Sequence, residues 1–324
     1  MIALEEIDMD GSVPERSIII SNGRCGSTLL SDLIAEEPDT LSAQEFFMSM
    51  APWSRSKEVL TGAEYWDVVS SPKEEISTLF RIGLPPKEVR YPATGRWGAD
   101  QERMPRILGI TLAKLTDDPD GLYDRLAEIV PSFPRQSAAR QHQDFLDLLA
   151  RLLDRPRWVE RSGGSSQVAP FLLANYPSAR FVYLTRNWAD SAKSMSRHPS
   201  FQLVQLRVEA LSKYGIDPFR VTDEESVPEE LRPYLPWRIT AELLRRRGDD
   251  PSRYVHLCAF MSSQAEQALD DSTPEHLLVM AYEDLLLDPV GQLTRLGEFL
   301  HFDDPAGWAD QVADRVKSPA RSAA

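Results

Sequence analysis

The stretch that decides the fold is Ser17–Leu30, which reads SIIISNGRCGSTLL. Its run of isoleucines predicts a β-strand, and Thr28–Ala35 has the apolar spacing of a helix. Between them, Gly23 and Gly26 let the backbone turn and come close to a ligand. A strand that enters a helix through small residues directs free backbone N–H groups and the positive end of the helix dipole at one point. The segment therefore predicts an anion site that would hold a phosphate.

The side chains of this turn are also suited to an anion. Arg24 supplies a fixed positive charge, and Ser27 and Thr28 add hydroxyl donors. The phosphate loop of nucleoside triphosphatases has the pattern G-x-x-x-x-G-K-[ST], and this chain has neither its spacing nor its lysine. An ordinary strand-to-helix turn capped by Ser27 is the alternative interpretation.

A second segment, Arg180–Ser194, reads RFVYLTRNWADSAKS and repeats the order of strand, polar turn and helix. Arg186 leaves the strand tip, and Asp190 falls in the first helical turn, where a carboxylate is favoured by the dipole. Ser194 follows one turn later on the same helix face. The alternative is a surface arginine next to a capped helix.

Together, the two segments resemble the cofactor motifs of sulfotransferases that use 3′-phosphoadenosine 5′-phosphosulfate (PAPS). The family's 5′-phosphosulfate loop has an apolar strand, Arg/Lys-Ser-Gly-Thr/Ser-Thr and an apolar helix, with Cys25 here at a position where serine is common. Its 3′-phosphate element has an apolar strand, Arg, Asn/Asp-x-x-Asp and a later Ser. The resemblance implies that PAPS contacts Gly23, Arg24, Cys25, Gly26, Ser27, Thr28, Leu29, Arg186 and Ser194.

A third segment agrees with this family. Leu277–Leu285 reads LLVMAYEDL, and Asp288-Pro289 then opens an apolar helix over Val290–Leu300. The order resembles a late block of many sulfotransferases, and we interpret it as scaffold, with a buried strand over Leu277–Tyr282.

The resemblance also implies catalytic roles. Arg24 would stabilise charge on the leaving phosphate. Many members use a histidine in a Lys-Thr-His segment as the base, but the similar place here reads ERSG over 160–163. Other members use a glutamate just after the first helix, and Glu45 matches that position. Phe46 and Phe47 follow it in sequence and would desolvate its carboxylate, which suits a general base.

Several alternatives stay open around the base. Glu45 could instead be a surface residue on an edge strand. His198, which follows Ser194 by one turn, is a second candidate base. Arg161 could pair with Glu160 or point at the sulfonate. Near the C-terminus, Arg315 and Lys317 could replace the family's late basic loop over the 3′-phosphate, although the glycines of its Arg-Lys-Gly pattern are missing.

Composition and net charge limit the kinds of partner and the cellular location that we expect. The chain has 324 residues, 42% of them hydrophobic, and a formal net charge of −14, which argues against nucleic-acid partners. The two cysteines lie far apart in the sequence, which predicts neither a disulfide framework nor a metal site. The N-terminus is acidic and no apolar run is long enough for a membrane span, so we expect a cytoplasmic protein. The pI of about 4.9 means that an anionic cofactor requires a local basic pocket.

The coarse pattern of strands and helices predicts an α/β fold with a parallel sheet covered by helices on both faces. We expect one sulfotransferase domain over 1–324, with insertions at 50–155 and 199–275 that shape the acceptor pocket. The segment from His198 to Pro251 reads as polar and proline-rich. The expected strands are Ser17–Ser21, Trp158–Glu160, Phe181–Thr185 and Leu277–Tyr282, and Thr40–Phe47 is expected to be a strand or an extended turn.

The predicted function is therefore transfer of a sulfonate group, without metal, from PAPS to a hydroxyl of a small-molecule, lipid or glycan acceptor. Trp53, Trp66, Trp97 and Trp237, all in the insertions, favour a partly apolar acceptor over a protein tyrosine. The alternatives are a phosphotransferase of the nucleotide kinase type and a non-catalytic nucleotide-binding module. Acceptor identity and oligomeric state do not follow from the sequence.

Overall fold

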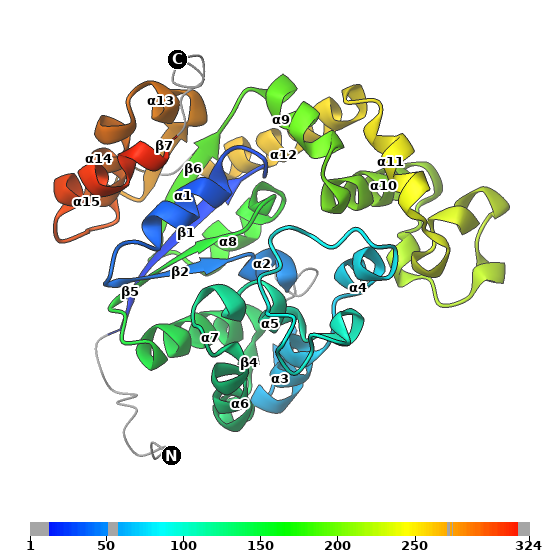
Figure 1. Cartoon of the computed structure of the whole chain (residues 1–324), viewed down its shortest axis with the longest axis horizontal. Helices are drawn as coiled ribbons and strands as arrows, with labels where there is room; N and C mark the ends of the chain where they lie inside the picture. Colours follow the sequence, from blue (N-terminus) through cyan, green and yellow to red (C-terminus); the bar gives the residue numbers. More distant parts are fainter. Residues whose placement is uncertain (1–12, 51–57, 271–272, 274, 317–324) are drawn as a thin grey trace. The chain divides into compact units, whose positions relative to one another are not determined.

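The computed structural model describes residues 13–50, 58–270, 273 and 275–316. The chain divides into two compact units (Figure 1). The first contains Met1–Tyr65, Glu128–Arg186 and Met261–Ala324, and the second contains Trp66–Ala127 and Asn187–Phe260. The predicted insertions, 50–155 and 199–275, are each divided between the two units, because 128–155 and 261–275 belong to the first unit. Their role in the acceptor pocket stays a prediction.

The first unit is built on a five-stranded parallel sheet with the strand order β2-β5-β1-β6-β7. This observation confirms the predicted fold class. β1 is the central strand, so the turn that follows it lies at the middle of the sheet's carboxyl edge, where ligands bind in open α/β sheets. The strands are β1 (Glu15–Ser21), β2 (Thr40–Gln44), β5 (Arg157–Arg161), β6 (Arg180–Thr185) and β7 (Leu277–Ala281); β3 (Val59–Leu60) and β4 (Gln136–Ser137) form a separate antiparallel pair.

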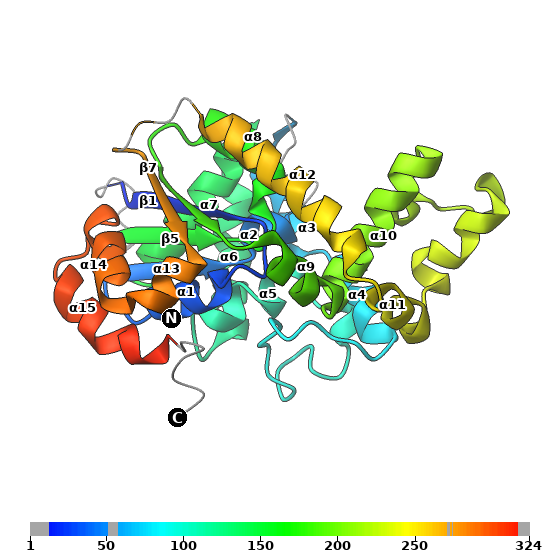
Figure 2. The same cartoon turned by 90° about the horizontal axis from the view of Figure 1, so that it is seen from above.

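Helices cover both faces of this sheet, as Figure 2 shows for α1, α14 and α15 on one side and α8 on the other. Successive side chains of a strand point to opposite faces of the sheet, so each strand contacts the helices on both faces. Ile19 and Val182 pack in one cluster with Leu33 of α1. Trp158 donates from Nε1 to Asp147 of α7 at 2.8 Å. Helices with all or most residues in this unit are α1 (Ser27–Ile34), α2 (Phe46–Ser49), α7 (Ala138–Leu152), α8 (Ala169–Asn175), α13 (Tyr282–Leu287), α14 (Pro289–Phe299) and α15 (Pro305–Val312).

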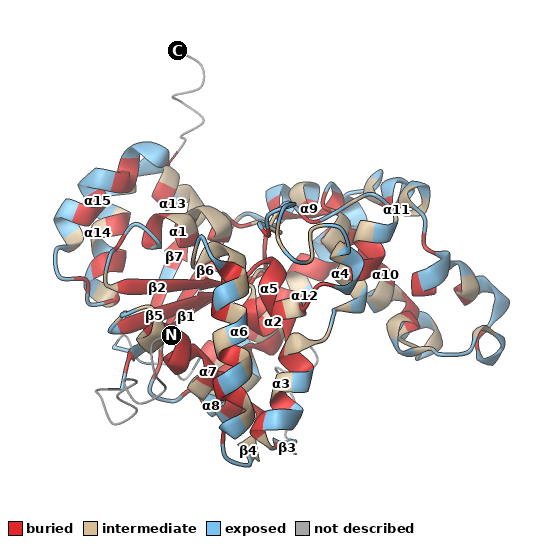
Figure 3. Ribbon diagram, turned by 60° about the horizontal axis from the view of Figure 1, so that its bottom comes forward, coloured by how far each residue is buried: buried red, intermediate tan, exposed pale blue. Residues whose placement is uncertain are grey.

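The inner strands have no solvated face. Figure 3 shows buried residues along β1, β5 and β6, and their burial patterns agree. Every residue of β5 is buried, including two arginines and Glu160. Charged groups at such positions require specific partners, because burial of an unpaired charge is costly.

The second unit is helical in its described residues. Its elements include α4 (Glu74–Arg81), α5 (Arg106–Gly109), α6 (Pro119–Ile129), α9 (Trp188–Ser196), α10 (Pro199–Tyr214) and α11 (Ala241–Gly248), while α3 (Gly62–Ser70) and α12 (Ser252–Leu269) extend across the unit boundaries. In the part of the chain that the structure describes, the short 3₁₀ turns are η3 (Gln101–Arg103), η4 (Leu112–Lys114), η5 (Val130–Ser132), η6 (Ser165–Val168), η7 (Pro218–Arg220), η8 (Glu224–Ser226), η9 (Glu229–Tyr234), η10 (Pro236–Arg238) and η11 (Ala313–Arg315).

α10 lies within the segment 198–251, which the sequence shows as polar and proline-rich. Pro199 lies at the first helical position, where a missing N–H has no cost, so this proline starts the helix instead of breaking it. Leu203 and Leu206 of α10 pack with Leu244 of α11 in a buried cluster. No helix in the described residues combines the length and the hydropathy that a membrane span requires.

Candidate functional site

The turn between β1 and α1 has the backbone of an anion cradle. Gly23, Arg24 and Gly26 have φ angles of 77°, 56° and 88°, all in the left-handed region. Gly26 is the N-cap of α1, and no side chain caps the helix there. Such a turn directs backbone N–H groups into one concavity, as anion-binding nests do. For Arg24 this conformation costs on the order of 1 kcal/mol, a strain that clusters at functional sites.

Tyr282 packs directly against this loop. A Cβ atom added at Gly26 would lie 2.2 Å from Cδ2 of the Tyr282 ring, so only glycine fits at this position. We assigned Tyr282 to scaffold from the sequence, as the end of a strand, but it opens α13. The signal available in the sequence was its place at the carboxyl end of a strand, the edge at which the loop also lies.

Arg186 lies beside the loop. Its Nη1 donates to the backbone oxygen of Arg24 at 3.0 Å, and its guanidinium carbon is 4.9 Å from the centre of the Tyr282 ring. Pairing of Ser21 with Leu184 in adjacent parallel strands explains the proximity, because both chains leave the sheet at the same edge. The two basic motifs predicted from separate segments therefore meet in space.

Cys25 contributes backbone rather than side chain to the loop. Its thiol is buried in the same apolar cluster as Leu30 and Leu33. Burial raises the pKa of the Cys25 thiol, against smaller lowering effects from Ser21 and Ser27. Thr28 and Leu29, the next two residues of the predicted contact set, are partly exposed.

Glu45 lies close to the loop between β1 and α1, with Gly163 beside both. It is the N-cap of α2 and has a φ of 57°. Its Oε1 accepts from Nη1 of Arg161, and both carboxylate oxygens accept from the backbone N–H of Gly163 at 3.1 Å. A Cβ atom added at Gly163 would lie 3.2 Å from Glu45 Oε1 and 3.8 Å from Gly23 Cα, so both lie against the same glycine. Glu45 is therefore not a residue of an exposed edge strand.

The Glu45 carboxylate contacts polar groups of Arg161 and Gly163, and its predicted desolvation stays a prediction. Phe46 and Phe47 turn into the core, where Phe46 stacks on Phe145 at 5.5 Å between ring centres. The pairing considered between Arg161 and Glu160 is corrected, since Arg161 pairs with Glu45. The physical reason is the strand pleat, which sends neighbouring residues to opposite faces of the sheet.

The desolvated carboxyl group in this region is Glu160. Its side chain is fully buried, and its Oε1 accepts from Ser162 Oγ at 2.6 Å and from the backbone N–H of Phe47 at 3.3 Å. Burial raises the pKa of Glu160 from 4.5 to about 8; the two hydrogen bonds oppose the shift and the charge of Glu45 adds to it. Burial therefore favours the protonated form of Glu160 at neutral pH.

We expect Glu160→Gln to become more stable relative to the parent chain as the pH rises from about 5 to about 8. The unfolded chain loses the Glu160 proton near pH 4.5, whereas the folded chain keeps it up to about pH 8. The parent's free energy of unfolding therefore falls in this window, by up to about 1.4 kcal/mol per pH unit, and glutamine removes that loss. Urea unfolding of both proteins at the two pH values measures the difference. A difference that does not change with pH would contradict a protonated Glu160.

Two predicted residues belong to the second unit. Ser194 lies on α9, whose first turn is capped by Asn187 through hydrogen bonds from Ala189 N and Asp190 N. His198 is the N-cap of α10 and is almost buried, with its Nε2 3.0 Å from Oε1 of Glu88. Their predicted roles toward nucleotide or acceptor stay predictions.

Arg315 lies away from the phosphate loop. Arg315 forms an ion pair with Glu36, which follows the C-terminal end of α1, whereas the phosphate loop precedes the other end of that helix. Lys317 lies outside the described residues. Because Arg315 is engaged at the far end of α1, we do not carry it into the proposed cofactor site.

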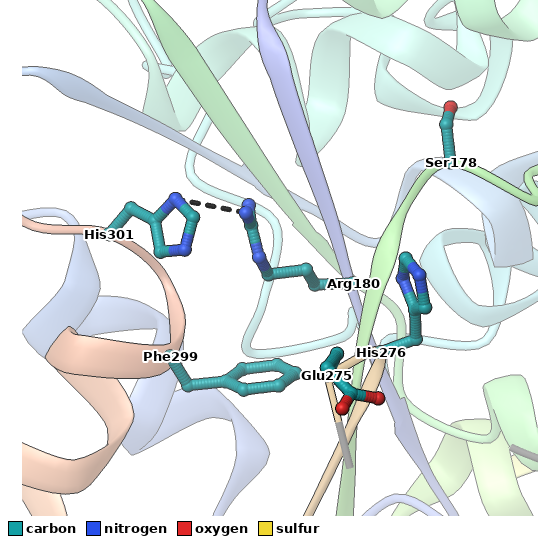
Figure 4. A pocket seen from close by; sticks show the side chains of 6 residues that line it. All are labelled: Ser178, Arg180, Glu275, His276, Phe299 and His301. Atoms are coloured by element: carbon teal, nitrogen blue, oxygen red, sulfur yellow. Dashed lines mark hydrogen bonds between the residues drawn. The ribbon is translucent and has the colours of Figure 1, made fainter. Parts of the chain in front are cut away.

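A pocket of about 410 Å³ lies at the opposite edge of the sheet, near the start of β6 (Figure 4). Its arginine, Arg180, bonds to Glu15 at 2.9 Å and to His301 at 2.9 Å, so its charge is already compensated. The pocket is lined by Ser178, Arg180, Glu275, His276, Phe299 and His301. Among the described residues, no three His, Cys, Asp or Glu side chains come together as a metal site would require.

Comparison with known proteins gives matches only among solved structures; no family model and no curated protein matches the chain. A sulfotransferase domain from the curacin biosynthetic pathway is 15% identical, and the alignment covers 90% of this chain and 75% of that one with a TM-score of 0.47. A sulfotransferase from Mycobacterium avium is 14% identical, with 94% and 68% covered and a TM-score of 0.42. A sulfotransferase domain of the olefin synthase from Synechococcus PCC 7002 is 16% identical, with 97% and 85% covered and a TM-score of 0.39.

The chain is similar in fold to sulfotransferases. This is the family that the sequence motifs resemble.

Proposed function

We propose that the chain is a sulfotransferase that moves a sulfonate group from PAPS to a hydroxyl of a small-molecule, lipid or glycan acceptor. One observation carries the proposal: an uncapped helix N-terminus, a second arginine and a carboxylate converge on one loop. Arg186 bonds to the carbonyl of Arg24, and Gly163 lies against both Glu45 and Gly23. An anion cradle with a carboxylate beside it suits transfer of an anionic group to a hydroxyl.

The donor fits the positive end of the site. Backbone N–H groups of 23–29 and the hydroxyls of Ser27 and Thr28 would hold the 5′-phosphosulfate, because these donors meet at the positive end of the α1 dipole. Arg186 would hold the 3′-phosphate through its planar guanidinium. Ser194 is proposed as a further 3′-phosphate ligand from the sequence motif alone. Because the whole chain has a net charge of −14, an anionic donor requires this local positive charge.

When bound, the donor supplies the sulfonate group. Glu45 accepts the proton of the acceptor hydroxyl while the new O–S bond forms and the S–O bond to the 5′-phosphate breaks. Arg24 and the loop amides stabilise the negative charge that the leaving phosphate oxygen gains.

The acceptor class is proposed from the aromatic residues of the helical segments. Trp66 packs on Tyr123 at 5.1 Å between ring centres, and Trp237 is 46% exposed. Trp53 lies outside the described residues. Aromatic side chains of this kind bind partly apolar molecules through large contact areas, which suits a small molecule, lipid or glycan.

Calorimetry with 3′,5′-adenosine bisphosphate, ADP and ATP tests the donor assignment. We expect binding of the bisphosphate in preference to the other two nucleotides and no requirement for magnesium, because the cradle and Arg186 are both part of the protein. A preference for ATP with magnesium would favour a phosphotransferase of the nucleotide kinase type. Binding of the bisphosphate without consumption of PAPS would favour a non-catalytic nucleotide-binding module.

A further inference from the structure

The residues that end β5 form a clamp around Glu45. Arg161 contacts two consecutive residues of the neighbouring strand end: its Nη2 donates to Gln44 Oε1 at 2.7 Å, and its Nη1 donates to Glu45 Oε1. The backbone N–H of Gly163 donates to both oxygens of the same carboxylate at 3.1 Å. The carboxylate is thus held from two directions by residues of one turn.

The same turn fixes the backbone around Glu45. The N–H of Glu45 donates to the carbonyl of Arg161 at 2.8 Å. The first N–H groups of α2 have no partner within the helix, and here Glu160 accepts from Phe47 N and Ser162 accepts from Met48 N at 3.1 Å. Side chains of β5 and its turn therefore cap α2 from across the sheet.

This support matches a strained conformation. Glu45 has a φ of 57°, which costs a non-glycine residue energy and persists only where neighbours over-determine it. The clamp also extends to the helix behind the anion cradle, since Gln44 Nε2 donates to Asp32 Oδ1 of α1 at 2.9 Å. Hydrogen bonds thus connect α1, whose N-terminus faces the loop, to the carboxylate through Gln44 and Arg161.

We propose that Arg161 and Gly163, supported by Ser162, are positioning residues that hold the Glu45 carboxylate beside the phosphate loop. The inference rests on the proposed sulfotransferase function. It assigns a role to the 160–163 segment, at the place where the family resemblance led us to expect a histidine base. In this role Arg161 acts through Glu45 and is not itself a ligand of the sulfonate.

The test compares Arg161→Gln with Arg157→Gln, which breaks an ion pair with Asp303 at the other end of the same strand. The assay follows transfer of ³⁵S-labelled sulfonate from PAPS to water, so that no acceptor needs to be known. We expect Arg161→Gln to lower kcat by about 10- to 100-fold, as small misplacements of a catalytic group do. KM for PAPS and the affinity for 3′,5′-adenosine bisphosphate should stay unchanged, and Arg157→Gln should keep kcat.

Two readouts separate positioning from a general loss of structure. Without the neighbouring cation, the acid limb of the kcat profile should move to higher pH in Arg161→Gln, and Arg161→Lys should restore part of both kcat and the profile. Gly163→Ala leaves Arg161 in place but puts a Cβ atom 3.2 Å from Glu45 Oε1, so it should lower kcat several-fold by displacing the carboxylate.

The outcomes distinguish this inference from the function on which it rests. A parent chain that neither binds the bisphosphate nor consumes PAPS overturns both. An active parent whose Arg161→Gln and Gly163→Ala variants keep kcat and pH profile overturns the clamp alone. A loss of PAPS affinity in Arg161→Gln at constant kcat would show that Arg161 is a ligand of the donor, which also overturns the inference.

Discussion

Replacing Glu45 by glutamine should lower kcat for sulfonate transfer by about 10²- to 10⁴-fold, the usual contribution of a general base. Glutamine keeps the shape of the side chain and can still accept from Arg161 and Gly163 through its oxygen, but it cannot take a proton from the acceptor hydroxyl. Affinity for 3′,5′-adenosine bisphosphate should stay unchanged, because the proposed phosphate ligands are untouched. Turnover of PAPS and calorimetry on the same preparation measure the two effects.

Glu298→Gln is the matched control, since Glu298 is an exposed glutamate of α14 in the same unit. It should leave both turnover and binding unchanged. Unchanged turnover in Glu45→Gln would contradict the assignment of the base. In that case His198, whose Nε2 pairs with Glu88, becomes the residue to replace next.

Replacing Arg186 by alanine should lower the affinity for 3′,5′-adenosine bisphosphate by about 10- to 150-fold. This loss is equivalent to the roughly 1.5–3 kcal/mol of a hydrogen bond to a charged group. Affinity for 5′-AMP should change little, because that nucleotide has no 3′-phosphate. The bisphosphate affinity of Arg186→Lys should lie between those of the parent chain and Arg186→Ala, since lysine keeps the charge but loses the planar fork. Calorimetric titration of each variant with both nucleotides measures the selectivity.

Arg295→Ala controls for loss of an arginine in the same unit, because Arg295 is exposed and its Nη1 only approaches the carbonyl of Val279 at 3.4 Å. Arg186 also bonds to the carbonyl of Arg24, so its removal could disturb the loop itself. Equal weakening of both nucleotides would mean that Arg186 supports the loop and does not contact the 3′-phosphate.

Much of the sheet could be predicted from the sequence. The isoleucine run before Ser21 and the apolar run that became β6 are buried strands, whose signal is a short β-branched or apolar segment between polar turns. The apolar run that became β7 is also a strand, but Val279 in its middle is exposed. Their parallel arrangement followed from the helices between them, because parallel strands require crossover connections. α10 was not assigned from the sequence, where 198–251 reads as polar and proline-rich, and Pro199 lies at the first position of this helix.

The candidate site divides in the same way. Gly23, Gly26 and Arg24 were identified because the turn from strand to helix is a local structure with local chemistry. The partners of Glu45 were not identified from the sequence. Arg161 and Gly163 are more than a hundred positions away in the chain and contact Glu45 only because β2 pairs with β5. Tyr282 was assigned to scaffold for a similar reason.

The sequence by itself determined the strand-to-helix turn, its glycines and its fixed charge, since these depend on backbone freedom and neighbouring residues. Tertiary structure alone decided the surroundings of the two carboxyl groups: Glu160 is fully buried, which raises its pKa, whereas Glu45 is held by a cation and a backbone N–H. The physical reason is that hydration and charge at a side chain depend on what lies around it in space, and the pleat of β5 sends Glu160 and Arg161 to opposite faces of the sheet.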